Sequence, residues 1–297
     1  MTEQTLSPPL ARNYFSSMLS LCKVEISLFA ALSAVAGLCA VAPLSATVLA
    51  LVTGGVFLIA CGAGALNHYQ ERNADALMPR TAGRPLPSGR IRPPVALTIS
   101  FSLIGSGAAV LCLAENPTPA LLGLAAVFWY NGFYTRFKAK SPLAAIPGAL
   151  VGAIPPVIGW AAGGGYLLDF RLAALCFFFF VWQVLHFMIH ILAFAGEYEN
   201  AGLPSLSRVF NERQLKRLAF QWLLAVATST LLLGLADLIH SALSLTAIAT
   251  ASFWLILKGI VFVRDRQSHY AILFKEINYY VLIIMTLLAL DGYFHFS

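Results

Sequence analysis

The chain has 297 residues, of which 59% are hydrophobic and only 11% are charged. Soluble globular domains carry roughly 25% charged residues, so this composition excludes an ordinary soluble enzyme and indicates an integral membrane protein. The formal net charge of +6 does not indicate nucleic-acid binding, because the cations gather in the connections between apolar stretches.

Apolar stretches of about 20 residues recur along the chain, each long enough to cross a hydrocarbon core of roughly 30 Å as a helix. They predict an all-α polytopic membrane protein, a bundle of nine transmembrane helices. We expect residues 1–17 to form a polar cytoplasmic N-terminal tail and residues 18–297 a single nine-helix domain. The expected helices are residues 18–41, 46–67, 94–114, 118–134, 143–163, 171–194, 217–236, 241–262 and 272–292.

Cations are concentrated in the connections that follow the second, fourth, sixth and eighth predicted helices, and the opposite connections contain only Arg171. Cytoplasmic loops of membrane proteins are enriched in Lys and Arg. The asymmetry therefore predicts a cytoplasmic N-terminus and a C-terminus on the opposite side. It also predicts that the long, charged connections face the cytoplasm.

The first predicted helix contains Lys23 and Glu25 and lacks a small-residue cleavage site. We therefore expect it to be retained and not removed as a signal peptide. The five cysteines have no CxxC spacing, so we expect buried free thiols and neither a disulfide nor a metal site.

Between the second and third predicted helices, residues 67–89 combine charges with turn residues. Asn67, Glu71 and Asp75 follow one another at intervals of four, so on a helix they form one oxygen-bearing stripe. Carboxylates suit a hard divalent cation and guanidiniums match phosphate oxygens. The stretch therefore predicts a metal-bound diphosphate site, and a solvated loop with a frayed helix end is the alternative. The arginines beside the stripe are Arg72, Arg80 and Arg84.

The fourth predicted helix ends in an aromatic and basic run over residues 129–140. This run is either an aromatic belt followed by cations at the headgroup level, or a second group of cations for the same phosphate. The fifth helix contains five glycines and prolines, which predict close helix packing, with a broken helix beside a cavity as the alternative. These residues are Gly148, Gly152, Pro155, Pro156 and Gly159.

The sixth predicted helix contains His186 and His190 four residues apart, but Phe187 rules out the HExxH pattern of zinc proteases. Each histidine is either a satisfied core residue or, for His186, a group that faces a polar cavity. Glu197 lies just past this helix, at a depth similar to that of Glu71, and is a further candidate metal ligand.

Three separated motifs together resemble the UbiA-type superfamily of intramembrane prenyltransferases, and within it the branch that farnesylates protoheme IX. They run over residues 67–89, 134–160 and 182–204. Glu71 stands where that family usually has Asp, and it preserves the charge. The sequence departs from the family pattern at three other positions, which concern the identity of the acceptor more than the binding of the prenyl donor. They are Ala139, Ala144 and Gly196.

The resemblance implies transfer of a farnesyl group from farnesyl diphosphate to a vinyl group of protoheme IX (haem B), giving haem O, at the cytoplasmic face of a bacterial inner membrane. Mg²⁺ would bridge the diphosphate to the protein. The implied metal ligands are Asn67, Glu71, Asp75 and Glu197. The implied diphosphate-binding cations are Arg72, Arg80, Arg84 and Lys138. The implied catalytic residues are Asp75, Glu71, Lys138, His186 and Tyr198, the last two to position the acceptor or handle a proton.

Two other functions fit part of the pattern. An enzyme of the same superfamily could use the same donor site with a quinone precursor such as 4-hydroxybenzoate. A secondary transporter also holds charges inside a helical bundle, but it is expected to show paired repeats, and the sequence contains no convincing repeat.

Overall fold

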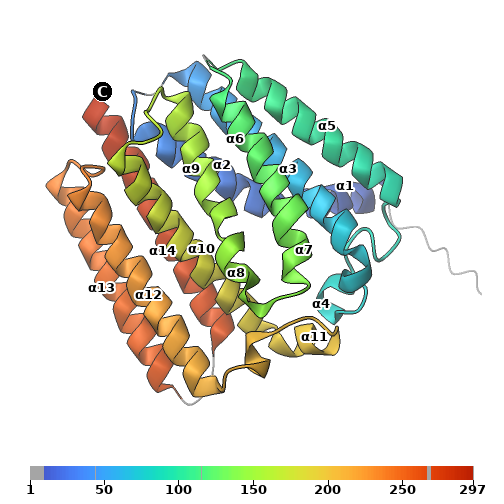
Figure 1. Cartoon of the computed structure of the whole chain (residues 1–297). Helices are drawn as coiled ribbons and strands as arrows, with labels where there is room; N and C mark the ends of the chain where they lie inside the picture. Colours follow the sequence, from blue (N-terminus) through green and yellow to red (C-terminus); the bar gives the residue numbers. More distant parts are fainter. Residues whose placement is uncertain (1–9, 44, 115, 266–268, 297) are drawn as a thin grey trace, which may run out of the picture.

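The structure is a computed structural model that describes residues 10–43, 45–114, 116–265 and 269–296 (Figure 1). These described residues form helices and contain no strand, so the all-α prediction is confirmed. Of the predicted tail, residues 1–9 lie outside the described residues, and residues 10–17 belong to helix α1 (Leu10–Leu21). The division at residue 18 stays a prediction.

Nine further α-helices of ten residues or more follow α1 in the described chain. They are α2 (Val24–Cys39), α3 (Ala46–Asp75), α5 (Pro93–Cys112), α6 (Thr118–Val127), α9 (Leu150–Ala162), α10 (Phe170–Ala193), α12 (Glu212–Leu235), α13 (Ala242–Arg264) and α14 (Tyr270–Phe296). Shorter elements connect them. They are α4 (Pro79–Ala82), the π-helix η1 (Phe128–Tyr134), α7 (Thr135–Lys138), the 3₁₀ turns η2 (Pro142–Ala144) and η3 (Leu206–Arg208), α8 (Ala145–Gly148) and α11 (Ala195–Asn200).

Seven helical stretches of the described chain are long and apolar enough to cross a membrane, so the protein is an integral multi-pass membrane protein. The first predicted helix is not straight, because α1 and α2 meet at a bend of 44°; counted as one span, this pair raises the number to eight. The fourth predicted helix, 118–134, passes from α6 into η1 and is not a continuous α-helix. A bundle of nine crossings therefore stays a prediction.

Close packing of α2 against α9 depends on glycines. A Cβ on Gly37 would overlap the backbone oxygen of Pro156, and a Cβ on Gly159 would overlap that of Ala34. Small residues let membrane helices approach backbone to backbone. The predicted role of the fifth-helix glycines in packing is thus confirmed at Gly159.

The fifth predicted helix is also broken. Residues 142–162 divide into η2, α8 and α9, and the break falls at Ala149. Pro155 and Pro156 lie inside α9, downstream of the break. The five cysteines are free thiols, as expected, but the prediction that they are buried is confirmed only for Cys39 and Cys61, and it is wrong for Cys112, which is exposed.

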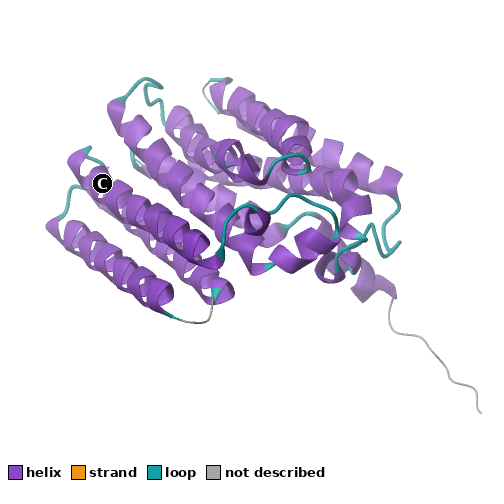
Figure 2. Cartoon of the chain, turned by 60° about the horizontal axis from the view of Figure 1, so that its bottom comes forward, coloured by secondary structure: helices purple, strands orange, loops and turns teal. Residues whose placement is uncertain are grey.

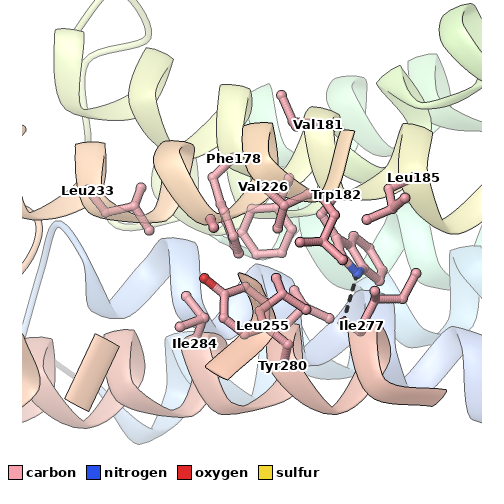
Figure 3. Packing of buried hydrophobic residues seen from close by; sticks show 14 of the residues in the cluster. Phe178, Val181, Trp182, Leu185, Val226, Leu233, Leu255, Ile277, Tyr280 and Ile284 are labelled. Carbon is pink, nitrogen blue, oxygen red and sulfur yellow. Dashed lines mark hydrogen bonds between the residues drawn. The ribbon is translucent and has the colours of Figure 1, made fainter. Parts of the chain in front are cut away.

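The largest buried cluster lies between α10, α12, α13 and α14 (Figure 3). Its aromatic side chains include Phe178 and Trp182, and Trp182 donates through Nε1 to the backbone oxygen of Ile277 at 3.2 Å. Tyr280 joins three helices, because its hydroxyl donates to Thr230 Oγ1 at 2.7 Å and lies 2.9 Å from Ser252 Oγ. Interhelical hydrogen bonds of this kind contribute about 0.6 kcal/mol each in membranes.

The short elements gather at one end of the bundle, as the two views show (Figures 1 and 2). Helices α4, α7, α8 and α11 lie together at that end, and the C-terminal end of α14 lies at the other (Figure 1). We call the first end the site end, because it carries the charged stretches singled out by the sequence.

Candidate active site

The acidic stripe lies on the last turns of α3, where it is buried inside the protein. α3 continues to Asp75, so Asn67, Glu71 and Asp75 are helical and lie along one face. Asn67 is 3% exposed and Asp75 is 2% exposed. This burial excludes the alternative of a solvated loop. Charged side chains are almost never fully buried without a partner, so Asp75 must have one.

Asp75 has its partner in the segment that follows α4. Arg84 donates through Nη1 to Asp75 Oδ1 and Oδ2, both at 2.8 Å. The chain turns back at α4, where the Thr81 hydroxyl donates to the backbone oxygen of Asp75 at 2.8 Å. This turn places the guanidinium beside the end of α3.

Glu71 is paired from the opposite side of the site. Lys138 Nζ lies 3.0 Å from Glu71 Oε1, and it also lies 5.7 Å from the centroid of the Tyr198 ring. Burial opposes the charge on Lys138, but the Glu71 carboxylate outweighs it and holds the pKa of Lys138 well above its ordinary value. The lysine is therefore a permanent cation at the site.

A cavity of about 380 Å³ lies beside these carboxylates. Both carboxylates line it, together with Lys138 and Arg136 from the end of α7. The remaining lining residues are Gln70, Ala74, Met78, Thr135, Ala139 and Leu203. The cavity is thus acidic along α3 and basic along α7, as a metal–diphosphate group requires.

Lys23 is a site residue that the sequence analysis did not identify. It lies at the bend between α1 and α2 with φ of 47°, in the left-handed region that costs a residue with a Cβ roughly 1–2 kcal/mol. Its ammonium donates to Asn67 Oδ1 at 2.6 Å and to the Tyr130 hydroxyl at 3.4 Å. A lysine inside an apolar stretch is the signal that could have found it.

Asn67 makes one hydrogen bond to the protein through each end of its side-chain amide. Its Oδ1 accepts from Lys23, and its Nδ2 donates to Thr135 Oγ1 at 3.2 Å. The side chain does not line the cavity. Its role as a metal ligand stays a prediction, and in this structure it joins α2, α3 and α7.

Glu197 approaches the site from α11. Its Oε2 accepts from the backbone nitrogen of Arg80 at 3.3 Å, which joins α11 to α4. The guanidinium of Arg80 lies 4.4 Å from the centroid of the Phe194 ring, and among the described residues its buried Nε has no hydrogen-bond partner. A buried donor left unpaired is rare and calls for a partner.

Other predicted residues lie away from the cavity. Arg72 stacks on Tyr69, 4.4 Å from the ring centroid, and donates to the backbone oxygen of the same residue at 2.6 Å. His186 pairs with Asn278 across α10 and α14, and the His190 ring lies tilted against that of Phe274, with centroids 5.4 Å apart. Neither histidine lines the cavity described above.

Within the described residues, no three His, Cys, Asp or Glu side chains lie close enough to hold a metal by themselves. Glu71 and Asp75 nevertheless share the wall of one cavity. Mg²⁺ is commonly bound through one or two carboxylates, with substrate phosphates and waters as the other ligands. Two carboxylates and an open cavity fit that mode of binding.

Comparison with known proteins agrees with this arrangement. The model of the UbiA prenyltransferase family matches residues 27–283. The protoheme IX farnesyltransferase of Geobacter sulfurreducens is 39% identical over 215 residues, which are 72% of this chain and 79% of the relative. The protoheme IX farnesyltransferase of Oleidesulfovibrio alaskensis is 30% identical over 92% of this chain and 95% of the relative.

A solved structure shares the fold. The UbiA homolog from Archaeoglobus fulgidus, bound to GPP and Mg²⁺, has a TM-score of 0.70 and covers 95% of this chain and 99% of its own, at 16% identity. The family match over most of the chain and the similarity to these relatives lead to one conclusion. The chain belongs to the UbiA prenyltransferase family and is a prenyltransferase enzyme.

Proposed function

We propose that this enzyme transfers a farnesyl group from farnesyl diphosphate to a vinyl group of protoheme IX (haem B) and so produces haem O. The observation that carries the proposal is the cavity lined by Glu71, Asp75 and Lys138. The acceptor is proposed from the names of the two relatives, which are 39% and 30% identical to this chain.

The donor binds by its diphosphate in this cavity. Glu71 and Asp75 line the cavity and are the residues that would hold Mg²⁺, and the ion would supply charge neutralisation for the leaving diphosphate. Glu197 does not line the cavity and accepts from the backbone nitrogen of Arg80, so its role as a further metal ligand stays a prediction. Lys138 and Arg84 form ion pairs with the two carboxylates. If the carboxylates held a metal ion, these two cations would be positioned to bind phosphate oxygens of the donor.

The reaction then follows from the charge at the site. The allylic C–O bond breaks, and its electron pair leaves with the diphosphate, stabilised by the cations along α7 and after α4. The vinyl π electrons of the acceptor form the new C–C bond to the farnesyl carbon. Water adds to the resulting carbocation and loses one proton, which leaves a hydroxyethylfarnesyl group. His186 and Tyr198 are the candidates to position the acceptor or take that proton.

We also propose nine crossings, with the N-terminus and the active site at the cytoplasmic face of a bacterial inner membrane. Two observations support this orientation. The charged segments of α4, α7 and α11 lie at the site end, and the C-terminal end of α14 lies at the other end (Figure 1). The connections at the site end hold most of the cations, as cytoplasmic loops do.

The test is product identification. Purified protein in detergent or lipid is incubated with Mg²⁺, farnesyl diphosphate and either protoheme IX or 4-hydroxybenzoate, and the products are identified by mass. We expect the mass of haem O from protoheme and no prenylated benzoate. Prenylation of 4-hydroxybenzoate alone would overturn the proposal in favour of a quinone precursor. Asp75→Ala should nearly abolish transfer in a folded, membrane-inserted protein.

A further inference from the structure

In the part of the chain that the structure describes, the hydrogen-bond partner of His186 lies on the last helix. His186 Nδ1, on α10, is 2.8 Å from Asn278 Oδ1, on α14. Trp182, one turn earlier on α10, donates to the backbone of Ile277 on the same helix. The Phe274 ring lies against the imidazole, with centroids 4.7 Å apart. The Trp182 ring also lies against the imidazole, with centroids 5.2 Å apart. The imidazole is therefore held at Nδ1 by a hydrogen bond and between aromatic rings.

The orientation of the Asn278 amide decides which nitrogen of His186 carries the proton. Asn278 Nδ2 donates to the backbone oxygen of Phe274 at 2.7 Å. A carbonyl oxygen only accepts hydrogen bonds, so the nitrogen of the amide must face Phe274. Asn278 Oδ1 then faces His186 and can only accept. His186 Nδ1 must be the donor.

A neutral imidazole with a proton on Nδ1 carries its lone pair on Nε2. Within the described residues, Nε2 of His186 has no hydrogen-bond partner and is not completely buried. The next side chain, Phe187, stacks on Tyr134 with centroids 5.2 Å apart. Tyr134 directly precedes Thr135, which lines the cavity.

We propose that Asn278 is a positioning residue that holds His186 in the Nδ1–H tautomer and presents the Nε2 lone pair to the reaction. Resting on the proposed function, this assigns to Nε2 the proton lost by the water that adds to the carbocation. The water oxygen forms the new C–O bond, and its proton passes to Nε2. The imidazole then becomes imidazolium, with both N–H groups donating. Asn278 Oδ1 accepts from Nδ1–H in both states and so needs no rearrangement.

The tautomer is measured without turnover. Full-length protein is labelled with ¹⁵N-histidine, and nitrogen shifts are recorded for the wild type, with His186→Gln to assign the signal. We expect an Nδ1–H signal for His186 in the wild type and in Asn278→Asp. We expect a mixture of tautomers in Asn278→Leu, which lacks the acceptor. A wild-type His186 protonated on Nε2 would overturn the inference, whatever the enzyme's activity.

Turnover provides the second measurement. Asn278→Leu should lower kcat by about 10- to 100-fold, the usual effect of losing the partner that orients a functional histidine. The KM for farnesyl diphosphate should not change, because Asn278 does not line the donor cavity. Asn278→Asp should restore kcat to within about fivefold, since its carboxylate also accepts from Nδ1–H. A wild-type kcat in Asn278→Leu would contradict the assignment.

Two controls separate positioning from helix docking. Tyr280→Phe removes the hydrogen bonds of α14 with Thr230 and Ser252, and it should lower thermal stability without changing the His186 tautomer. Thr286→Val alters an exposed α14 residue whose hydroxyl donates to Leu282 of the same helix, and it should change neither measurement. If Tyr280→Phe changed the tautomer as Asn278→Leu does, the effect would belong to helix packing and the inference would fail. If no variant formed haem O but the tautomer pattern held, only the proposed function would fail.

Discussion

Arg84 Nη1 lies 2.8 Å from both carboxylate oxygens of Asp75, and the carboxylate is almost completely buried. One guanidinium nitrogen thus neutralises the charge of Asp75 at the end of α3. Substitutions of the two residues can therefore distinguish the contribution of this ion pair to stability from its contribution to prenyl transfer.

Replacing Arg84 should mainly lower stability, whereas replacing Asp75 should mainly abolish transfer. Arg84→Met leaves a buried carboxylate without its cation, which should cost about 2 kcal/mol of stability, less than the 3–5 kcal/mol of a fully buried pair. Asp75→Asn removes the charge, so it should be nearly as stable as the wild type but should not support transfer. Thermal unfolding and the transfer assay measure the two effects. Arg171→Met, which breaks an ion pair with Asp169 outside the cavity, is the control and should leave transfer unchanged.

The two basic residues Lys138 and Arg72 should differ in their effect on donor binding. Lys138 lines the cavity and remains charged, and hydrogen bonds to charged groups contribute about 1.5–3 kcal/mol. Lys138→Met should therefore raise the KM for farnesyl diphosphate by about 10- to 100-fold. Arg72 stacks on its own helix, so Arg72→Met should change that KM by less than about threefold. Equal effects of the two variants would contradict the assignment of the cavity.

Lys23 should matter although no motif includes it. Lys23→Met leaves Asn67 Oδ1 without its donor, and an unsatisfied buried acceptor costs about 1–3 kcal/mol. We expect a lower unfolding temperature and slower transfer, because Asn67 connects the bend to α7. Lys258→Met is the matched control, since its ammonium pairs with Glu276 on a partly exposed surface. A wild-type unfolding temperature in Lys23→Met would show that the ammonium does not support the bend.

Gly159 should tolerate no side chain. Its Cβ would overlap the backbone oxygen of Ala34, and overpacking a core position costs about 1–3 kcal/mol. Gly159→Val should therefore lower the unfolding temperature and the yield of folded protein by separating α9 from α2. Gly105→Val introduces the same side chain where no atom lies within 4 Å, and it should be tolerated. Equal stability of the two variants would contradict the close contact of α2 with α9.

Much of the fold was predictable because the signals are local. Hydropathy located most of the long helices, since each apolar stretch must satisfy its own backbone. The interval of four residues between Asn67, Glu71 and Asp75 predicted their common face, which α3 confirms. The pairing of Glu71 with Lys138 was not predictable, because it joins residues 67 positions apart in the sequence.

The features that the sequence analysis missed depend on tertiary contacts. The bend at Lys23 is held by side chains from α3 and η1. A break in the fifth helix was one of the alternatives in the sequence analysis, but its position at Ala149, and not at a proline, was not predicted. The interval of four residues between His186 and His190 raised the question of zinc, whereas the partner of His186 is an asparagine on α14.

The π-helix η1 has a consequence for the length of the chain. A π turn accommodates one more residue than an α turn, and Lys138 lies four residues beyond the end of η1. Deleting one residue within 128–134 would let the segment relax to an α-helix and would rotate α7 by about 100° relative to α3. Every side chain of the site would survive such a deletion, yet Lys138 would no longer face Glu71. The number of residues in η1 is therefore as important for the active site as the charged side chains, because it sets the direction in which Lys138 points.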